Sequence, residues 1–318
     1  MIGYVLRRLL QALPVLLGVS LVAFALVRLV PGDPVTALLG PGYNEQQATA
    51  LRQKYALDRP MPVQYLAWLG RAVRGDFGES FFTGQPVLRA IVERLPVTLE
   101  LTGIGVAFAV LVGVPLGVVS AVRPGRGVDH LVRVVGLLGI SVPGFWLGTV
   151  LILLVSLRLG WVPSGRFVHL CDDPAENLRR MLLPGLALGT AVAAVVMRTA
   201  RSAMLDVVAQ DYVRTARAKG LGGRAVVVRH ALRNALVPIV TVIGLQAGYL
   251  LGGSVVIEQV FSLPGVGRLA LQAITSRDYA LLQGVVLFVA AAFVLVNLLV
   301  DLLYAKLDPR IGYGGAAA

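Results

Sequence analysis

The sequence predicts an all-α membrane protein with about six transmembrane helices. Of its 318 residues, 57% are hydrophobic and only 14% are charged, whereas a soluble domain has about 25% charged residues. The apolar residues gather in windows of about 20, the length that a helix needs to cross the hydrocarbon core of a bilayer. The net charge is +12, and most of its Lys and Arg residues lie between these windows, which is typical of charges that set membrane topology.

Six charge-free windows account for the predicted spans, and each has a length suited to crossing a bilayer. In chain order they are 9–27, 101–122, 134–157, 181–197, 234–257 and 279–300. The second window extends back to Val97 if Glu100 is placed near its outer end, where it can reach water or a partner. An even number of spans puts both termini on the same side of the membrane.

Lys and Arg residues near the ends of the spans predict the orientation of the chain. They precede the first span, follow the last, and occupy the loops after the second and fourth spans, all on one side. Both termini are therefore expected to be cytoplasmic. Arg7 and Arg8 before an apolar run would also suit a signal peptide, but the run is longer than a usual signal core and no A-x-A site follows it.

The spans divide the chain into segments with different expected roles. These are 1–30 for the N-terminus and first helix, 31–96 for an extracytoplasmic loop region, 97–304 for the helical core with a cytoplasmic loop at 201–233, and 305–318 for a cytoplasmic tail. Within the outer loop, 44–57 is predicted as a helix capped by Asn44. Trp161 is predicted as an interfacial anchor in a turn between two spans.

Sequence motifs of catalysis and metal binding are missing from the chain. It has no phosphate-binding loop, nucleophile elbow, HExxH segment or paired-carboxylate site. Cys171 is the single cysteine, and the three histidines are scattered. We therefore predict no catalytic, cofactor-binding or metal-binding residues, no enzyme activity and no nucleic-acid partner. Few ionisable groups lie within the spans, which weakens a proton-driven mechanism and suggests a pathway that relies on a separate motor.

A short basic helix is predicted in the loop between the fourth and fifth spans, within 211–223. Asp211 is expected to cap its start, and Gly220 to end it in the left-handed conformation that glycine permits. Tyr212 and Ala216 share a face that leads to Gly220, and small residues there would let a partner approach closely. The alternative is a loop whose charges only set topology, but a capped projecting helix is better suited to receiving force from a cytoplasmic partner.

The same stretch resembles a known motif. The fragment RTARAKG resembles the E-A-A-x-x-x-G loop of ABC importer permeases, with Arg214 in place of Glu and Thr215 in place of the first Ala, while Ala216 and Gly220 match. The fragment RNALVP at 233–238 resembles the proline end of that motif, at a longer spacing. The order of further fragments resembles the dipeptide/oligopeptide permease family over nearly the whole chain. They are VPGDPV (30–35), GDFGES (75–80), SVPGFWLG (141–148), LGWVPSG (159–165) and LPGVGRLALQAITSRDY (263–279).

The resemblance implies an ABC importer (type I) permease fold with an extracytoplasmic loop domain between helices 1 and 2. It implies a multi-pass protein of the bacterial cytoplasmic membrane that forms half of a translocation pathway and works by alternating access. The implied partners are a second homologous permease subunit, two ABC ATPase subunits that bind ATP and Mg, and an extracytoplasmic peptide-binding protein. This chain itself is expected to bind no cofactor.

Two sets of site residues follow from this reading. The residues expected to couple to an ATPase are Asp211, Tyr212, Arg214, Thr215, Ala216, Arg217, Lys219 and Gly220. Polar residues within the spans are candidates for the translocation pathway, and they are Gln246, Thr241, Ser141 and Asn297. Alternatives remain open, since nickel and glutathione permeases resemble the same family, and a stand-alone secondary transporter or a membrane-bound enzyme would belong to a different class.

Overall fold

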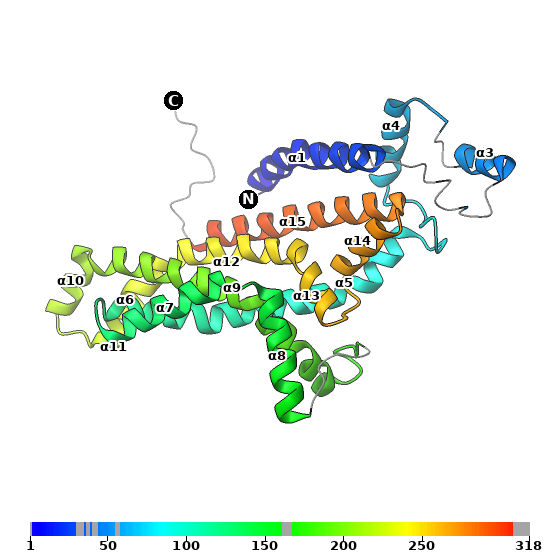
Figure 1. The fold of residues 1–318 in the computed structure, drawn as a ribbon. Helices are drawn as coiled ribbons and strands as arrows, with labels where there is room; N and C mark the ends of the chain where they lie inside the picture. The colour runs from blue at the N-terminus through cyan, green and yellow to red at the C-terminus, as the bar shows by residue number, and fades with distance from the viewer. Residues whose placement is uncertain are drawn as a thin grey trace. The chain divides into compact units, whose positions relative to one another are not determined.

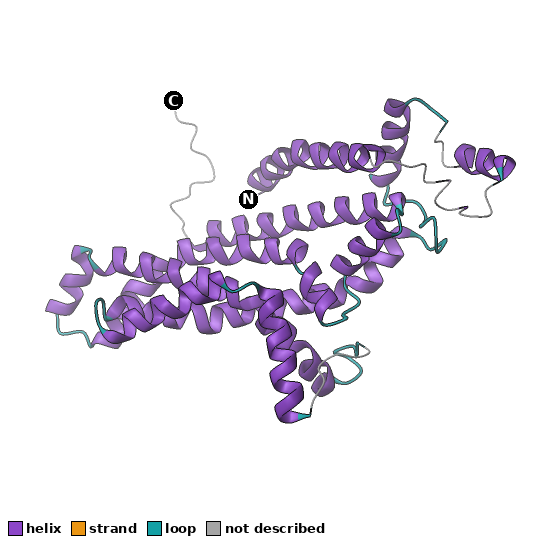
Figure 2. Ribbon diagram, viewed as in Figure 1, coloured by secondary structure: helices purple, strands orange, loops and turns teal. Residues whose placement is uncertain are grey.

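The computed structural model describes a helical chain. The residues it describes are 2–29, Val35, Leu39, 44–54, 58–160 and 167–307. Within these residues there is no strand (Figure 2), and one isolated antiparallel bridge joins Glu79 and Pro86. The predicted anchor Trp161 lies outside the described residues.

The helices belong to two compact units, and the chain passes from one unit to the other within α5, between Leu263 and Pro264, and within α15. The first unit combines Met1–Thr98 with Pro264–Val294, and the second combines Leu99–Leu263 with Leu295–Ala318. The segment from 264 to 294, which the sequence analysis assigned to the helical core, therefore packs with the segment that precedes Leu99.

The first unit contains two helices, α3 and α4, between the first and second spans. Its elements are α1 (Ile2–Leu29), α3 (Glu45–Lys54), α4 (Met61–Ala72), the first part of α5 (Val87–Phe108), α14 (Val266–Thr275) and the first part of α15 (Tyr279–Leu307). Asn44 accepts a hydrogen bond from the Gln46 amide at 2.9 Å, which confirms the predicted cap of α3. Helices α4 and α14 were not predicted from the sequence.

Aromatic and aliphatic side chains hold these elements of the first unit together. Phe24 of α1 meets Tyr65 of α4 edge to face, with ring centroids 5.4 Å apart, a geometry that aromatic pairs favour. The Tyr65 hydroxyl lies 2.8 Å from Ser20 Oγ. A separate apolar core joins α5, α14 and the start of α15, and its buried members are Val87, Ala90, Ile91, Val266, Leu269, Ala273, Leu281 and Val285.

The second unit is organised around α9, the 35-residue helix Pro174–Val208. This helix packs against α6, α7, α8 and α12. The elements of the unit are the rest of α5, the π-helix η2 (Ala109–Gly113), α6 (Val114–Val122), α7 (Gly127–Ser141), α8 (Gly144–Leu159), α9, α10 (Asp211–Ala218), α11 (Gly223–Ala225), the π-helix η3 (Val226–Leu232), α12 (Arg233–Gly253), α13 (Val255–Val260) and the end of α15.

Glycines let the helices of the second unit approach α9 closely. A Cβ added at Gly117 of α6 would lie 2.5 Å from the carbonyl oxygen of Met197, and one at Gly189 of α9 would lie 2.6 Å from that of Gly105. Neither position has room for a side chain, because the obstacle is backbone. Small residues at helix contacts are typical of membrane bundles, whose stability depends on close packing.

Five described helices are long and apolar enough to span a membrane, and a bent pair brings the number to six. The prediction of six spans is confirmed in this form. The third span is not the continuous helix predicted at 134–157, because α7 and α8 meet at a bend of 100° (Figure 1). Pro143 offers no N–H to the helix ladder, and Val142 before it is extended, with φ −82° and ψ 119°, as a residue before proline prefers.

The other span boundaries differ in detail from the prediction. Helix α5 begins at Val87 rather than near Val97 and continues through Pro96. Glu100 accepts a hydrogen bond from Asn177 at 3.0 Å, which is one of the two alternatives expected for it, a partner or water. The fifth span ends at Gly253, and the short helix α13 follows it.

Candidate functional site

Helix α10 is a short helix of eight residues, Asp211–Ala218, between α9 and η3. Its C-terminus is a Schellman motif: the Gly220 amide donates to Arg217 O at 2.9 Å, and the Leu221 amide donates to Ala216 O at 3.4 Å. Gly220 has φ +80°, the left-handed conformation that was predicted for it. Asp211 does not cap the start as predicted, because Gln210 is the N-cap residue and Asp211 is the first residue of the helix.

The two faces of α10 are clearly separated. Val213 and Ala216 are buried, with exposed fractions of 0% and 7%, and the helix packs against α9 and η3. The expectation that Ala216 offers its surface to a partner does not hold for this chain, since its own neighbours cover that side chain. The other predicted coupling residues are exposed, and they are Asp211, Tyr212, Arg214, Thr215, Arg217, Lys219 and Gly220.

The exposed outer face of α10 makes few strong interactions within the chain, so most of its side chains can contact a partner. Arg214 Nη1 lies 3.6 Å from Asp211 Oδ1, but both side chains are at least 80% exposed, so the pair contributes little. The Thr215 hydroxyl donates to Asp211 O at 2.9 Å. The outer face therefore carries Arg214, Arg217 and Lys219 as cations that a negatively charged partner could bind.

Tyr212 connects α10 to the next membrane helix. Its hydroxyl accepts a hydrogen bond from Asn234 Nδ2 at 2.6 Å and lies 3.4 Å from His230 O. His230 belongs to η3, and Asn234 belongs to the first turn of α12. The bond therefore connects α10 to α12 across η3. As a π-helix, η3 has i→i+5 backbone hydrogen bonds, a geometry that often occurs at functional sites.

An ion pair anchors α9 about two turns before its end. Arg201 donates from Nε to Asp129 Oδ1 at 2.8 Å and from Nη2 to Asp129 Oδ2 at 3.1 Å. Asp129 also accepts from Ser120 Oγ at 2.6 Å and from the Gly125 amide at 2.9 Å. This cluster joins the α6–α7 turn to α9, close to the point where α9 leads into α10.

The predicted pathway residues do not form a connected site. Gln246 and Thr241 are half-buried on α12, and the Thr241 hydroxyl donates to its own helix at Val237 O, 2.8 Å away. Ser141 is exposed at the end of α7, and Asn297 is half-buried on α15. Among the described residues no hydrogen bond joins any two of the four.

The partners of the charged and aromatic groups were not predicted from the sequence. Arg201 was read as a charge that sets topology, and nothing in the sequence connects it with Asp129, 72 residues away. The sequence gives only a weak indication of the Tyr212–Asn234 hydrogen bond. Tyr212 lies just before RTARAKG, and Asn234 lies within RNALVP, the two fragments that resemble the coupling motif. In the described part of the chain, no three His, Cys, Asp or Glu side chains gather as they would around a metal ion.

Two family models match the chain. The model described as "Binding-protein-dependent transport system inner membrane component" matches residues 113–313, and the model of its N-terminal part matches residues 1–102. The chain belongs to this family of ABC importer permeases and is a transmembrane permease subunit of an importer.

Curated relatives match along nearly the full length. The chain is 40% identical to the oligopeptide transport system permease protein AppB of Bacillus subtilis over 316 residues, covering 98% of this chain and 100% of the relative. It is 40% identical to the dipeptide permease DppB of Alkalihalophilus pseudofirmus over 337 residues, with the same coverage of both chains. It is 43% identical to the glutathione permease GsiC of Salmonella typhimurium over 313 residues, again covering 98% and 100%.

A solved structure has the same fold. The chain superposes on a chain of the MetNI methionine ABC transporter in an inward-facing conformation with a TM-score of 0.58 and 19% identity, covering 70% of this chain and 97% of that one. The predicted all-α importer permease fold is thereby confirmed.

Proposed function

We propose that this chain is the permease subunit of an ATP-driven peptide importer and that α10 is its contact with an ATPase subunit. The observation that carries the proposal is the division of α10, whose inner face is buried on α9 and η3 while its outer face is exposed and cationic. A helix fixed in this way moves with the membrane helices on both sides of it. It can therefore pass a movement of a partner to the pathway.

The proposed mechanism is alternating access driven from outside the chain. ATP binding draws the two ATPase subunits together, and α10 follows the subunit to which Arg214, Arg217 and Lys219 bind. Helix α9 moves with α10 because the chain continues directly between them, and α12 moves because Asn234 is bonded to Tyr212. Hydrolysis of ATP then returns the helices to their starting position.

The proposed assembly follows from this mechanism. A second permease subunit completes the pathway, two ATPase subunits bind ATP and Mg, and an extracytoplasmic binding protein delivers the cargo. The termini and α10 lie on the cytoplasmic side, as the distribution of Lys and Arg predicts. We propose peptide as the cargo because the relatives include oligopeptide and dipeptide permeases. The similarity to a glutathione permease favours glutathione, itself a small peptide, as the second candidate.

A substitution at Gly220 tests the role of α10. Gly220→Val places a β-branched residue at φ +80°, where it costs about 1–2 kcal/mol and distorts the end of α10. In proteoliposomes we expect ATP hydrolysis to continue while peptide uptake falls severalfold. Gly222→Val is the matched control, because Gly222 is equally open but has φ −58°, which valine adopts easily. Normal uptake per ATP in Gly220→Val would contradict the proposal.

Photo-crosslinking tests the partner and the orientation together. A photoreactive residue in place of Arg214, which is 80% exposed, should give an adduct with an ATPase subunit. The same residue in place of Val73, which is 81% exposed in the predicted extracytoplasmic region, should not. An ATPase adduct at residue 73, or none at residue 214, would overturn the proposed arrangement. Binding assays with dipeptides, glutathione and Ni²⁺ on the delivery protein would then decide the cargo.

A further inference from the structure

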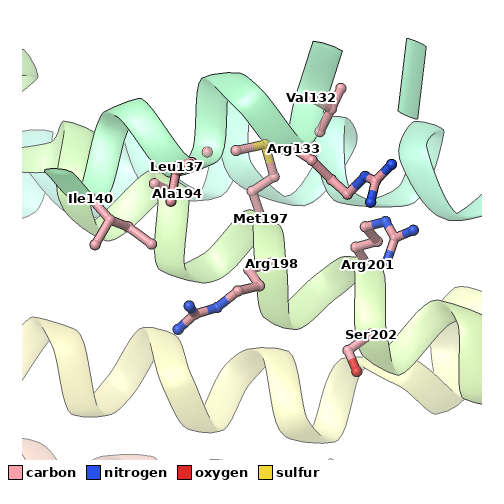
Figure 3. A pocket seen from close by; sticks show the side chains of 10 residues that line it. Val132, Arg133, Leu137, Ile140, Ala194, Met197, Arg198, Arg201 and Ser202 are labelled. Carbon is pink, nitrogen blue, oxygen red and sulfur yellow. The ribbon is translucent and has the colours of Figure 1, made fainter. Parts of the chain in front are cut away.

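A cavity of about 460 Å³ lies between α7 and α9 in the second unit (Figure 3). This volume is within the usual range for small-molecule sites. Part of its lining is apolar, with Val132, Leu137 and Ile140 from α7 and Met197 from α9. Three arginines, Arg133, Arg198 and Arg201, form its cationic part, and the small residues Gly136, Ala194 and Ser202 complete the lining.

The charges around the cavity do not balance. Arg201 is paired with Asp129 through two hydrogen bonds. Arg133 lies farther from the same carboxylate, at 3.7 Å, and contacts His130 Nδ1 at 2.6 Å. The lining thus carries three guanidinium groups and no acidic side chain, and the single carboxylate of Asp129 contacts only two of the three. The surplus is positive and would attract an anion.

Arg198 is the guanidinium best placed to bind that anion. It is exposed, and within the described part of the chain it has neither a hydrogen bond nor an ion pair. In Figure 3 its guanidinium points away from Arg201 and Arg133, so it does not share their carboxylate. Arginine suits phosphate in particular, since its planar fork can bind two phosphate oxygens at once.

We propose that this cavity binds an anionic phospholipid, with the phosphate on Arg198 and an acyl chain along Leu137 and Ile140. An occupant with one anionic end and one apolar end matches a lining that is divided in the same way. The α7 surface beside the cavity is apolar and exposed, with Leu138 56% accessible, so an acyl chain can continue along it. Basic pockets between membrane helices on the cytoplasmic side characteristically hold anionic headgroups.

The same lining is poorly suited to the cargo. A peptide brings an ammonium group as well as a carboxylate, and the described residues of the lining offer no acidic side chain to the ammonium. The nearby carboxylate of Asp129 is already bound by Arg201, Ser120 and the Gly125 amide. A lipid phosphate needs no such partner. The choice of leaflet, though not the lipid chemistry, rests on the orientation given under Proposed function.

The test measures lipid bound to the purified importer that contains this chain at full length. After delipidation in detergent, dioleoylphosphatidylglycerol is titrated and the bound lipid is counted by native mass spectrometry. We expect wild type to bind this lipid in preference to dioleoylphosphatidylcholine. Arg198→Gln should weaken binding about tenfold, the effect of losing one charge-assisted hydrogen-bonding group. Arg126→Gln is the matched control, since it removes a cation from the start of α7 outside the cavity, and should bind as wild type does.

One further variant and two competition experiments distinguish a lipid site from a site for other anions. Leu137→Trp fills the apolar part without changing charge and should also weaken binding. Inorganic phosphate and dialanine, each at millimolar concentration, should fail to displace the lipid. Displacement by phosphate would show a site for small anions in general, and displacement by dialanine would show a site for the cargo. Either result would overturn the proposal. Wild-type lipid affinity in Arg198→Gln would also overturn it. Because the readout is bound lipid, these failures are distinct from a failure of coupling or transport.

Discussion

Arg201 of α9 binds Asp129 of α7 at two points, with Nε–Oδ1 and Nη2–Oδ2 distances of 2.8 and 3.1 Å. Asp129 is 1% exposed, so this carboxylate depends on its protein partners. The same Asp129 holds Ser120 and the Gly125 amide. Since α10 begins ten residues after Arg201, a displacement of α10 is expected to reach the α6–α7 turn through this pair as well as through the backbone.

Removing one member of this pair should destabilise the protein more than removing both. Arg201→Met leaves the buried Asp129 with only the longer contact to Arg133, at 3.7 Å, and losing one member of a buried ion pair costs about 3 kcal/mol. Asp129→Asn combined with Arg201→Met removes both charges and should recover part of the loss. Thermal unfolding of the four forms in detergent gives the coupling free energy as a double-mutant cycle. Additive effects of the two substitutions would show that the pair does not act as a unit.

Tyr212→Phe should loosen α10 from α12 without unfolding either helix. The lost hydroxyl accepts one hydrogen bond from Asn234, at 2.6 Å, which corresponds to about 1 kcal/mol. We expect normal expression and assembly but less peptide imported for each ATP hydrolysed. The measurement is simultaneous uptake and phosphate release in proteoliposomes. Tyr249→Phe, on the exposed surface of α12, is the control; an unchanged import ratio in Tyr212→Phe would remove Tyr212 from the coupling route.

The broad fold could be predicted because apolar length and cation position are properties of each segment alone. The span at 279–300 and the left-handed Gly220 needed no knowledge of distant residues, and the structure has both. The bend at Pro143 was accessible in principle, since proline and the residue before it carry known restrictions. It was missed because the apolar window at 134–157 continues through it without a charged residue.

Long-range pairings could not be predicted in the same way. A lone Arg201 in a basic loop has the same sequence signal whether it faces water or a buried Asp129. The burial of Ala216 was missed for a related reason, because a small residue on a short helix suits both a core contact and a partner contact. In the structure the neighbours α9 and η3 cover it, so the choice is made by packing and not by the helix itself.

Asp278 and Ser80 give a prediction for the first unit. Ser80 Oγ donates to Asp278 Oδ2 at 2.5 Å, and the Leu281 amide donates to Asp278 Oδ1 at 3.1 Å. Asp278→Ala removes both a helix cap and the acceptor for a buried hydroxyl, which together should cost about 2 kcal/mol. Asp278→Asn keeps an acceptor for the cap and should cost less. Melting temperatures of the two variants in detergent check this order, and the reverse order would contradict the assignment of Asp278 as the cap of α15.

Two glycines offer a matched test of helix packing around α9. Gly189→Leu forces a Cβ to within 2.6 Å of Gly105 O and 2.9 Å of its Cα, so α5 and α9 must separate. Overpacking of this kind costs about 1–3 kcal/mol, and here the obstacle is backbone that cannot change rotamer. Gly103→Leu, on the same α5 helix, meets no atom within 4 Å and should leave the melting temperature nearly unchanged. If both variants melt alike, the close approach of α5 and α9 is not a source of stability, and the role of small residues in this bundle would have to be assigned to movement instead.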